Sequence, residues 1–212
     1  MKKLLIIGDQ EVVREGLKGI LDEPHGTMIF GEAGTAPQAL QLVQEQDWDA
    51  AILDLSLGGG DGGGLELLKE IVRIRPRLPV LILSMHAEEQ YAWRAFKAGA
   101  VGYVTRDSAG LEMVKAVRQV MAGECYVIPA FVEKLLANLR RGAPGEPHES
   151  LSDREFEVLC LIGSGKTVGE IANRLSLSDK TISTYRARIL EKMHMKTNAD
   201  LMRYAIQNRL SQ

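Results

Sequence analysis

The stretch Ala50-Ala51-Ile52-Leu53-Asp54-Leu55-Ser56 decides the fold of this chain. It is an apolar run without polar alternation that ends in a carboxylate, which is typical of a buried parallel strand that brings an acid to the edge of its sheet. A glycine-rich segment, 58–64, follows at once and favours a loop whose backbone can approach a ligand closely. Ligands of open α/β sheets collect outside the carboxyl ends of the strands, so we predict a functional site around Asp54.

Segments of strand and helix character alternate on both sides of this stretch. Apolar runs predict strands over 3–7, 27–30, 50–54, 79–84 and 101–104. Apolar residues at helical spacing predict helices over 11–22, 36–46, 65–75, 88–97 and 109–122. Five repeats of strand and helix predict a doubly wound, flavodoxin-like α/β domain of five parallel strands over residues 1–122.

The remaining residues are patterned as helices only. A connecting segment, 123–150, holds a helix-like stretch over 129–139 and a linker with two prolines and two glycines over 140–150. Residues 151–212 predict four helices, the first opened by a capping box of Ser152 and Glu155. Two helices joined by the tight turn before Ser178, inside a small helical domain, predict a helix-turn-helix arrangement.

Composition and charge fit a two-domain protein. Of the 212 residues 45% are hydrophobic and 25% charged, which is ordinary for a soluble globular protein. No apolar run approaches the length of a membrane span, so we expect a cytoplasmic protein with no membrane partner. Residues 1–140 carry a formal charge of −4 and residues 151–212 carry +3. An acidic front and a basic tail suggest different partners, the partner of the tail being a polyanion.

Polar side chains stand at the exits of four of the five predicted strands. They are Asp9, Asp54, Ser84, and Tyr103 with Arg106. Each alone could be a simple helix cap, but together they converge on one edge of the sheet. A carboxylate can accept a phosphoryl group, a second one can help to hold Mg²⁺, and a hydroxyl and a fixed cation can receive phosphoryl oxygens.

At this point the chain resembles bacterial two-component response regulators of the NarL/FixJ type. The resemblance covers nearly all residues and is carried by Leu53-Asp54-Leu55-Ser56-Leu57, by Pro79-Val80-Leu81-Ile82-Leu83-Ser84-Met85, by Ala98-Gly99-Ala100-Val101-Gly102-Tyr103-Val104, and by Leu151-Ser152-Asp153-Arg154-Glu155. It implies that a sensor histidine kinase phosphorylates Asp54. It also implies that Asp9, Asp54 and the backbone carbonyl of Ser56 hold Mg²⁺, and that Ser84 and Tyr103 rearrange when phosphate arrives.

The pocket departs from the family pattern in three places. Gly8 stands where the family has the first of two adjacent acids, and Arg106 stands where it has a lysine. Gly58 replaces a proline, and Gly63-Gly64 look like an insertion. The loss of one acid should weaken Mg²⁺ binding, and a forked guanidinium is not equivalent to an ammonium group. A loop this rich in glycine should be entropically costly to order.

The candidate recognition helix is 179–190. Its exposed side mixes short hydroxyls, which suit base edges, with cations, which suit phosphates. The predicted DNA-binding residues are Lys166, Thr167, Lys180, Thr181, Ser183, Thr184, Arg186, Arg188 and Lys192. A single small domain grips DNA weakly, so we expect a homodimer on symmetric half-sites of double-stranded DNA. Leu201, Met202 and Ala205 of the last helix are candidates for that interface, unless they only close the core of the domain.

Three functions remain open at this stage. The first is a transcription factor that is switched by phosphorylation of Asp54. The second is an enzyme of the acidic pocket such as a phosphatase, which is disfavoured because Ser56 stands where a general acid would be needed. The third is a DNA-binding regulator with a degenerate metal pocket that works independently of phosphorylation.

Overall fold

The computed structural model describes residues 1–22, 28–58, 61–85, 89–107, 110–127, 132 and 146–210. Its first part is a parallel sheet of five strands in the order β2-β1-β3-β4-β5. The strands are β1 (Lys2–Ile7), β2 (Met28–Ala33), β3 (Ala50–Asp54), β4 (Val80–Ser84) and β5 (Gly102–Thr105). This order confirms the predicted doubly wound α/β domain.

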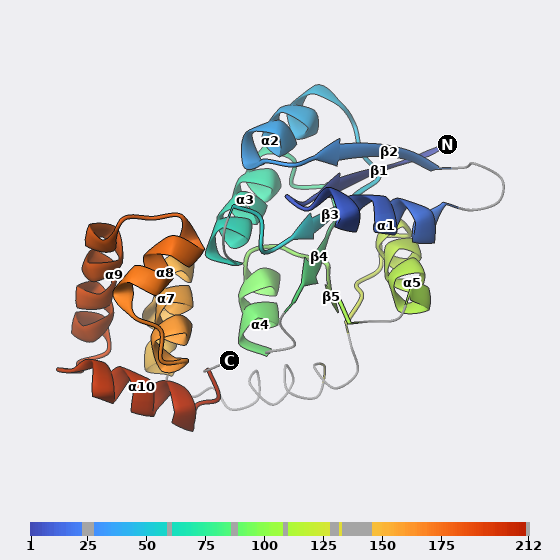
Figure 1. The fold of residues 1–212 in the computed structure, drawn as a ribbon. Helices are drawn as coiled ribbons and strands as arrows, with labels where there is room; N and C mark the ends of the chain where they lie inside the picture. The colour runs from blue at the N-terminus through green and yellow to red at the C-terminus, as the bar shows by residue number, and fades with distance from the viewer. Residues whose placement is uncertain are drawn as a thin grey trace.

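Five helices cover the two faces of the sheet. They are α1 (Glu11–Leu21), α2 (Ala36–Glu45), α3 (Asp61–Ile74), α4 (Glu89–Lys97) and α5 (Gly110–Met121). Helices α1 and α5 lie on one face, and α2, α3 and α4 lie on the other (Figure 1). Every residue of β3 and β4 is buried, which explains why their sequences show no polar alternation.

The last described part is a small helical domain. It contains a short 3₁₀ helix, η1 (Pro147–Ser150), and then α7 (Asp153–Gly163), α8 (Val168–Leu175), α9 (Asp179–Lys192) and α10 (Asn198–Gln207). Ser152, Thr167 and Thr197 each form a complete capping box, and Ser178 caps α9. Between α8 and α9 the chain turns at Ser176, whose φ of 54° ends α8 in the left-handed region. The predicted helix-turn-helix is therefore confirmed as an architecture.

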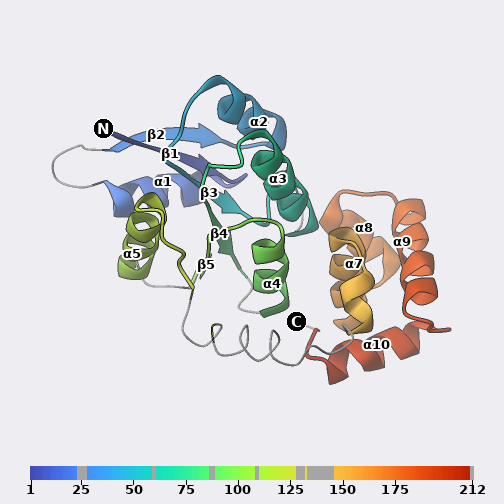
Figure 2. The same ribbon diagram turned by 180° about the vertical axis from the view of Figure 1, so that it is seen from behind.

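The two parts pack against each other through α7. Figures 1 and 2 both show α7 beside α3 and α4, with α9 on the side of the helical domain that faces away from the sheet. The aromatic rings of Tyr91 on α4 and Phe156 on α7 meet edge to face at 5.4 Å between centroids. Buried apolar side chains of the α2–α3–α4 face and of the helical domain form one continuous cluster.

Two predictions about loops are wrong. The glycine segment is not a free loop up to Leu65, because α3 begins at Asp61 and Gly62 to Gly64 form its first turn. The predicted linker ends early, because residues 147–150 form η1 and His148 is 1% exposed. The helix predicted over 129–139 falls almost entirely outside the described residues. Within the described part of the chain, no helix is long and apolar enough to cross a membrane.

Candidate functional site

Asp54 is the last residue of β3 and lies at the carboxyl edge of the sheet, as predicted from its strand. Its carboxylate is buried, with 2% of the residue exposed. Oδ1 accepts hydrogen bonds from the backbone N–H of Ser56 at 3.1 Å and from the Ser56 hydroxyl at 2.8 Å. Oδ2 accepts a hydrogen bond from Nη2 of Arg106, and the two side chains form an ion pair. The chain itself thus neutralises this buried charge.

The strand register brings Ser84 and Arg106 to the same edge. Ser84 ends β4 and pairs with Thr105 of β5, and its carbonyl oxygen accepts a hydrogen bond from the backbone N–H of Arg106 at 2.8 Å. Tyr103 lies further back in β5, opposite Ile82, and is 4% exposed within the apolar cluster of the α3–α4 face. The structure therefore brings Arg106 to Asp54, whereas Tyr103 lies in the apolar core.

The donor set fits a divalent cation poorly. Mg²⁺ demands nearly octahedral oxygen coordination, usually with one or two carboxylates. Asp9 is exposed, its neighbour Gly8 offers no side chain, and both carboxylate oxygens of Asp54 already accept hydrogen bonds. Among the residues that the structure describes, no group of three or more His, Cys, Asp or Glu side chains could hold a metal ion.

Helix α9 presents its polar side to solvent. Ile182 and Ile189 are fully buried, while Lys180, Ser183 and Arg188 are exposed, which agrees with the predicted division into an inner and an outer side. Lys166 and Thr167, just before and at the start of α8, are also exposed. Together these residues form an uncovered face of the helical domain that mixes cations with short hydroxyls.

Several predicted DNA contacts are already engaged within the domain. Nζ of Lys192 donates to Oε2 of Glu155 at 2.6 Å, so this cation pairs with an acid of α7. Burial works to raise the pKa of Glu155, but the hydrogen bonds from Lys192 and Ser152 outweigh it and leave the pKa below its ordinary value. The Thr181 hydroxyl pairs with Ser178 at 2.8 Å, and the Thr184 hydroxyl donates to the carbonyl of Lys180 at 2.9 Å. Arg186 is half-buried.

The residues predicted for a dimer interface on α10 need correction. Leu201 and Ala205 are fully buried inside the helical domain, so they close its core, where α10 packs against α7. Met202 is half-buried. The exposed apolar side chain of α10 is Ile206, which is 60% accessible. The periodicity of the helix correctly marked an apolar side but could not separate the part that faces the core from the part that faces outward.

The contact between the domains is a feature that the sequence interpretation missed. The guanidinium of Arg94 on α4 donates to the carbonyl of His148 at 2.8 Å, to the carbonyl of Leu151 at 3.0 Å and to Asp153 at 3.0 Å. It also lies 4.1 Å from the centre of the Phe156 ring. Lys69 on α3 pairs with the other oxygen of Asp153 at 2.6 Å. Two cations of the first domain thus hold one acid of the second.

A second part of this contact explains the glycine run. The backbone N–H of Gly62 donates to Oε2 of the buried Glu157 on α7 at 3.3 Å, and Arg154 donates to the same oxygen at 3.0 Å. A Cβ at Gly62 would lie 2.8 Å from Cδ of Arg154 and 2.8 Å from Oε2 of Glu157. A Cβ at Gly64 would lie 2.3 Å from the carbonyl oxygen of Leu55. Glycine is therefore required at Gly62 and Gly64, because the backbone there lies too close to α7 and to Leu55 for a side chain. The glycine run is the sequence signal that could have indicated this contact.

A buried histidine stands at the start of the helical domain. Nδ1 of His148 lies 2.8 Å from the hydroxyl of Tyr204 on α10. Burial, assisted by the nearby charge of Arg94, lowers the pKa of His148 from its ordinary value of 6.5. Burial also raises the pKa of Tyr204 to about 12. The neutral forms of both groups are thus the ones that the fold stabilises.

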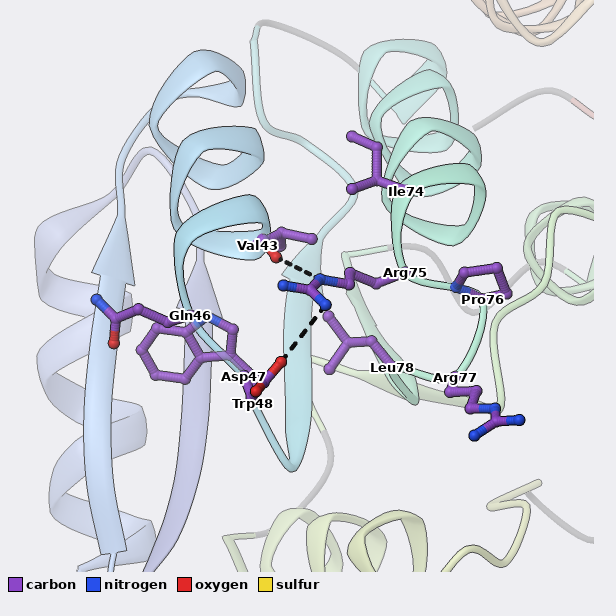
Figure 3. Close-up of a pocket in the computed structure, with 9 residues that line it drawn as sticks. All are labelled: Val43, Gln46, Asp47, Trp48, Ile74, Arg75, Pro76, Arg77 and Leu78. Carbon is purple, nitrogen blue, oxygen red and sulfur yellow. Dashed lines mark hydrogen bonds and ion pairs between the residues drawn. The ribbon is translucent and has the colours of Figure 1, made fainter.

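A pocket of about 440 Å³ lies at the other end of the sheet from Asp54. Figure 3 shows it between the end of α2 and the segment that leads into β4, with Trp48 and Leu78 in its wall. Arg75 spans it, donating to the carbonyl of Val43 at 3.0 Å and pairing with Asp47 at 3.4 Å. No predicted site residue lines this pocket, so its size does not mark the functional site.

Comparison with protein families assigns both parts of the chain. Residues 4–118 match the response regulator receiver domain, and residues 149–205 match the bacterial regulatory proteins of the luxR family. Response regulator GacA of Pseudomonas aeruginosa is 32% identical over 209 residues, which are 98% of this chain and 97% of that protein. Response regulator UvrY of Escherichia coli is 31% identical over 211 residues, covering 99% and 96%.

Solved structures agree over the same length. The RcsB response regulator of Salmonella typhimurium has a TM-score of 0.57 at 27% identity. The match covers 96% of this chain and 98% of the RcsB chain. A structure of a complex of RcsB with DNA has a TM-score of 0.56 at 26% identity, with 96% of each chain covered. The chain therefore belongs to the response regulators that join a receiver domain to a LuxR-type helix-turn-helix domain.

Proposed function

We propose that this chain is a transcriptional regulator, not an enzyme, and that it binds double-stranded DNA through α9. The observation that carries the proposal is the outer side of α9, where Lys180, Ser183 and Arg188 are exposed while Ile182 and Ile189 anchor the helix from beneath. Cations on such a face suit DNA phosphates and hydroxyls suit base edges. The similarity to RcsB, which was solved as a complex with DNA, supports the same reading.

The input of the regulator is Asp54. It is a buried carboxylate at the ligand-binding edge of a parallel sheet, next to a hydroxyl on Ser56 and a guanidinium on Arg106. A sensor histidine kinase is the expected phosphodonor, because the chain belongs to the two-component response regulators. With these partners we expect a cytoplasmic protein that works as a homodimer on paired half-sites.

Receiver domains generally bind Mg²⁺, and we propose that this chain has only a weak Mg²⁺ site. Asp9, Asp54 and the backbone carbonyl of Ser56 are the groups that would hold the ion, which would supply positive charge to the phosphoryl oxygens. Two carboxylates, one exposed and the other ion-paired with Arg106, favour only loose binding. Ser84 and Tyr103 stay our candidates for the residues that respond to phosphate, with Ser84 at the sheet edge and Tyr103 in the core.

Two measurements test this proposal. Purified protein is incubated with acetyl phosphate and millimolar Mg²⁺, and intact mass spectrometry should detect one added phosphoryl group that is lost in Asp54→Asn. DNA fragments are then selected from a genomic library with wild type and with Arg188→Ala. A protein that selects no sequence, and whose binding does not weaken as salt rises, would not be a DNA-binding regulator of this kind.

A further inference from the structure

The pocket around Asp54 already contains a cation that belongs to the chain. Asp54 is the end of β3 and Arg106 follows β5 directly, so their meeting is set by the sheet and not by a mobile loop. Nη2 of Arg106 donates both to Oδ2 of Asp54 and to the hydroxyl oxygen of Ser56, the latter at 3.0 Å. One guanidinium thus balances the carboxylate and touches the hydroxyl beside it.

Gly8 stands where the family has a second acid, and it lies next to a second cation, Arg14. A Cβ at Gly8 would lie 3.5 Å from Oδ2 of Asp54, so any acid placed there would reach the same ion as Asp54. In this chain the carbonyl oxygen of Gly8 instead accepts a hydrogen bond from Nη1 of Arg14 at 2.7 Å. The guanidinium of Arg14 is itself paired with Glu32. The site therefore has one carboxylate fewer than the family pattern, and the carboxylate that it keeps is ion-paired with Arg106, which disfavours a divalent cation.

Arg106 also has one hydrogen-bond donor that is unpaired among the described residues. Its Nε is buried and has no hydrogen-bond partner within the described part of the chain. A buried donor without a partner is costly, and a guanidinium offers a planar fork that matches the oxygens of phosphate. An incoming phosphoryl group would give Nε an acceptor and would lie beside the positive charge of the guanidinium.

Given the proposed phosphorylation of Asp54, we propose that Arg106 replaces the divalent metal ion, so that an acyl phosphate phosphorylates Asp54 without Mg²⁺. An oxygen of the Asp54 carboxylate attacks phosphorus and forms a new P–O bond. The bond from phosphorus to the acyl oxygen breaks, and its electron pair leaves with the departing carboxylate. No proton is transferred, and total charge is conserved. Arg106 moves its hydrogen bonds from the attacking carboxylate to the phosphoryl oxygens.

Metal binding is measured first, without any phosphodonor. Mn²⁺ is titrated into the full-length protein and free Mn²⁺ is followed by electron paramagnetic resonance. The wild type should bind Mn²⁺ only weakly, whereas the double variant Gly8→Asp with Arg106→Lys should bind at least about tenfold more tightly, because it gains a carboxylate and loses the guanidinium that pairs with Asp54. Gly19→Asp adds the same charge on α1 at a glycine with nothing within 4 Å of its added Cβ, and it should leave Mn²⁺ binding unchanged.

Labelling is measured second, with acetyl phosphate in the presence of Mg²⁺ or of EDTA. The initial rate of the wild type should change by less than about threefold, whereas the rate of the double variant should fall at least about tenfold in EDTA, because only there does a metal ion carry the charge. A wild type that binds Mn²⁺ as tightly as the double variant, or that loses its labelling in EDTA, overturns the role of Arg106. A wild type that is labelled in neither condition refutes the proposed phosphorylation, and the Mn²⁺ titration still decides on Arg106. Thermal melts of each variant verify folding.

Discussion

The most informative perturbation is Gly62→Ala, because it adds one methyl group at the contact between the two domains. That methyl would lie 2.8 Å from Oε2 of Glu157, 2.8 Å from Cδ of Arg154 and 3.3 Å from its backbone Cα. The side-chain atoms can move but the backbone atom cannot move without shifting α7. The carboxylate of Glu157 must therefore leave the N–H of Gly62, which loses its hydrogen bond at the first turn of α3.

The expected size follows from that loss. An unpaired buried donor costs about 1–3 kcal/mol, so a central value of about 2 kcal/mol shifts the docking equilibrium roughly thirtyfold toward separated domains. Alanine also favours the helix over glycine by up to about 1 kcal/mol, which stabilises α3 itself and not the contact. Gly19→Ala on α1 is the matched control, since it gains the same helix propensity with nothing within 4 Å of its new methyl group.

The assay is hydrogen–deuterium exchange of the full-length protein, combined with small-angle X-ray scattering. Gly62→Ala should raise exchange at the start of α3 and along α7 and increase the radius of gyration, while Gly19→Ala should match the wild type. Adding Arg94→Ala removes the other half of the contact and should enlarge both effects. The reasoning is refuted if this double variant stays folded and is as compact and as protected as the wild type.

Three further outcomes follow from the same structure. Burial lowers the pKa of His148 below its ordinary value of 6.5, so between the folded and the unfolded pKa the native state binds fewer protons than the unfolded chain. The free energy of unfolding should therefore fall as pH drops through about 6.5 and level off below the folded pKa. Urea titrations between about pH 5 and 8 should show this slope in the wild type and in the exposed-site control His194→Gln, but not in His148→Gln. Arg188→Ala should weaken binding to all DNA sequences and lower the salt slope by about one, whereas Arg203→Ala on α10 should leave the slope unchanged. Gly62→Ala should change the DNA affinity of the monomer by less than about threefold, since α9 already faces away from the receiver, and a tenfold gain would contradict that geometry.

The sheet and the capped helices were predictable because local chemistry decides them. The unbroken apolar run before Asp54 indicates a strand buried on both faces, and Ser152 with Glu155 marks the start of α7 through hydrogen bonds within one turn. The same reasoning placed Asp54 and Ser84 at one edge, since parallel strands end together. The ion pair of Arg106 with Asp54 follows from that placement.

The sequence failed where distant segments decide the outcome. Glycine is a poor helix former, so the sequence of Gly62 to Gly64 predicts a loop, yet the structure has a helix there in close contact with Leu55 and α7. Leu201 looked equally suited to a core or to a dimer interface, and only packing against α7 shows that it is buried. Arg94 carries no local pattern at all, because its partners lie more than fifty residues away.

The position of the glycine run constrains how a signal from Asp54 can travel. Ser56 holds Asp54 by two hydrogen bonds, and the Leu55 backbone next to it lies against Gly64, in the turn where Gly62 contacts Glu157 of α7. A phosphoryl group that draws Ser56 or Arg106 away from Asp54 therefore disturbs the segment on which α7 rests.

Helix α7 packs in turn against α9, and Glu155 at its start holds Lys192 at the end of α9. Because the outer side of α9 is exposed even while the domains are docked, release of α7 does not uncover the proposed DNA-binding surface. If the proposed homodimer forms on adjacent half-sites, we predict that the receiver acts by freeing the helical domain to meet a second copy, so its output should appear as cooperativity of DNA binding before it appears as affinity of the monomer.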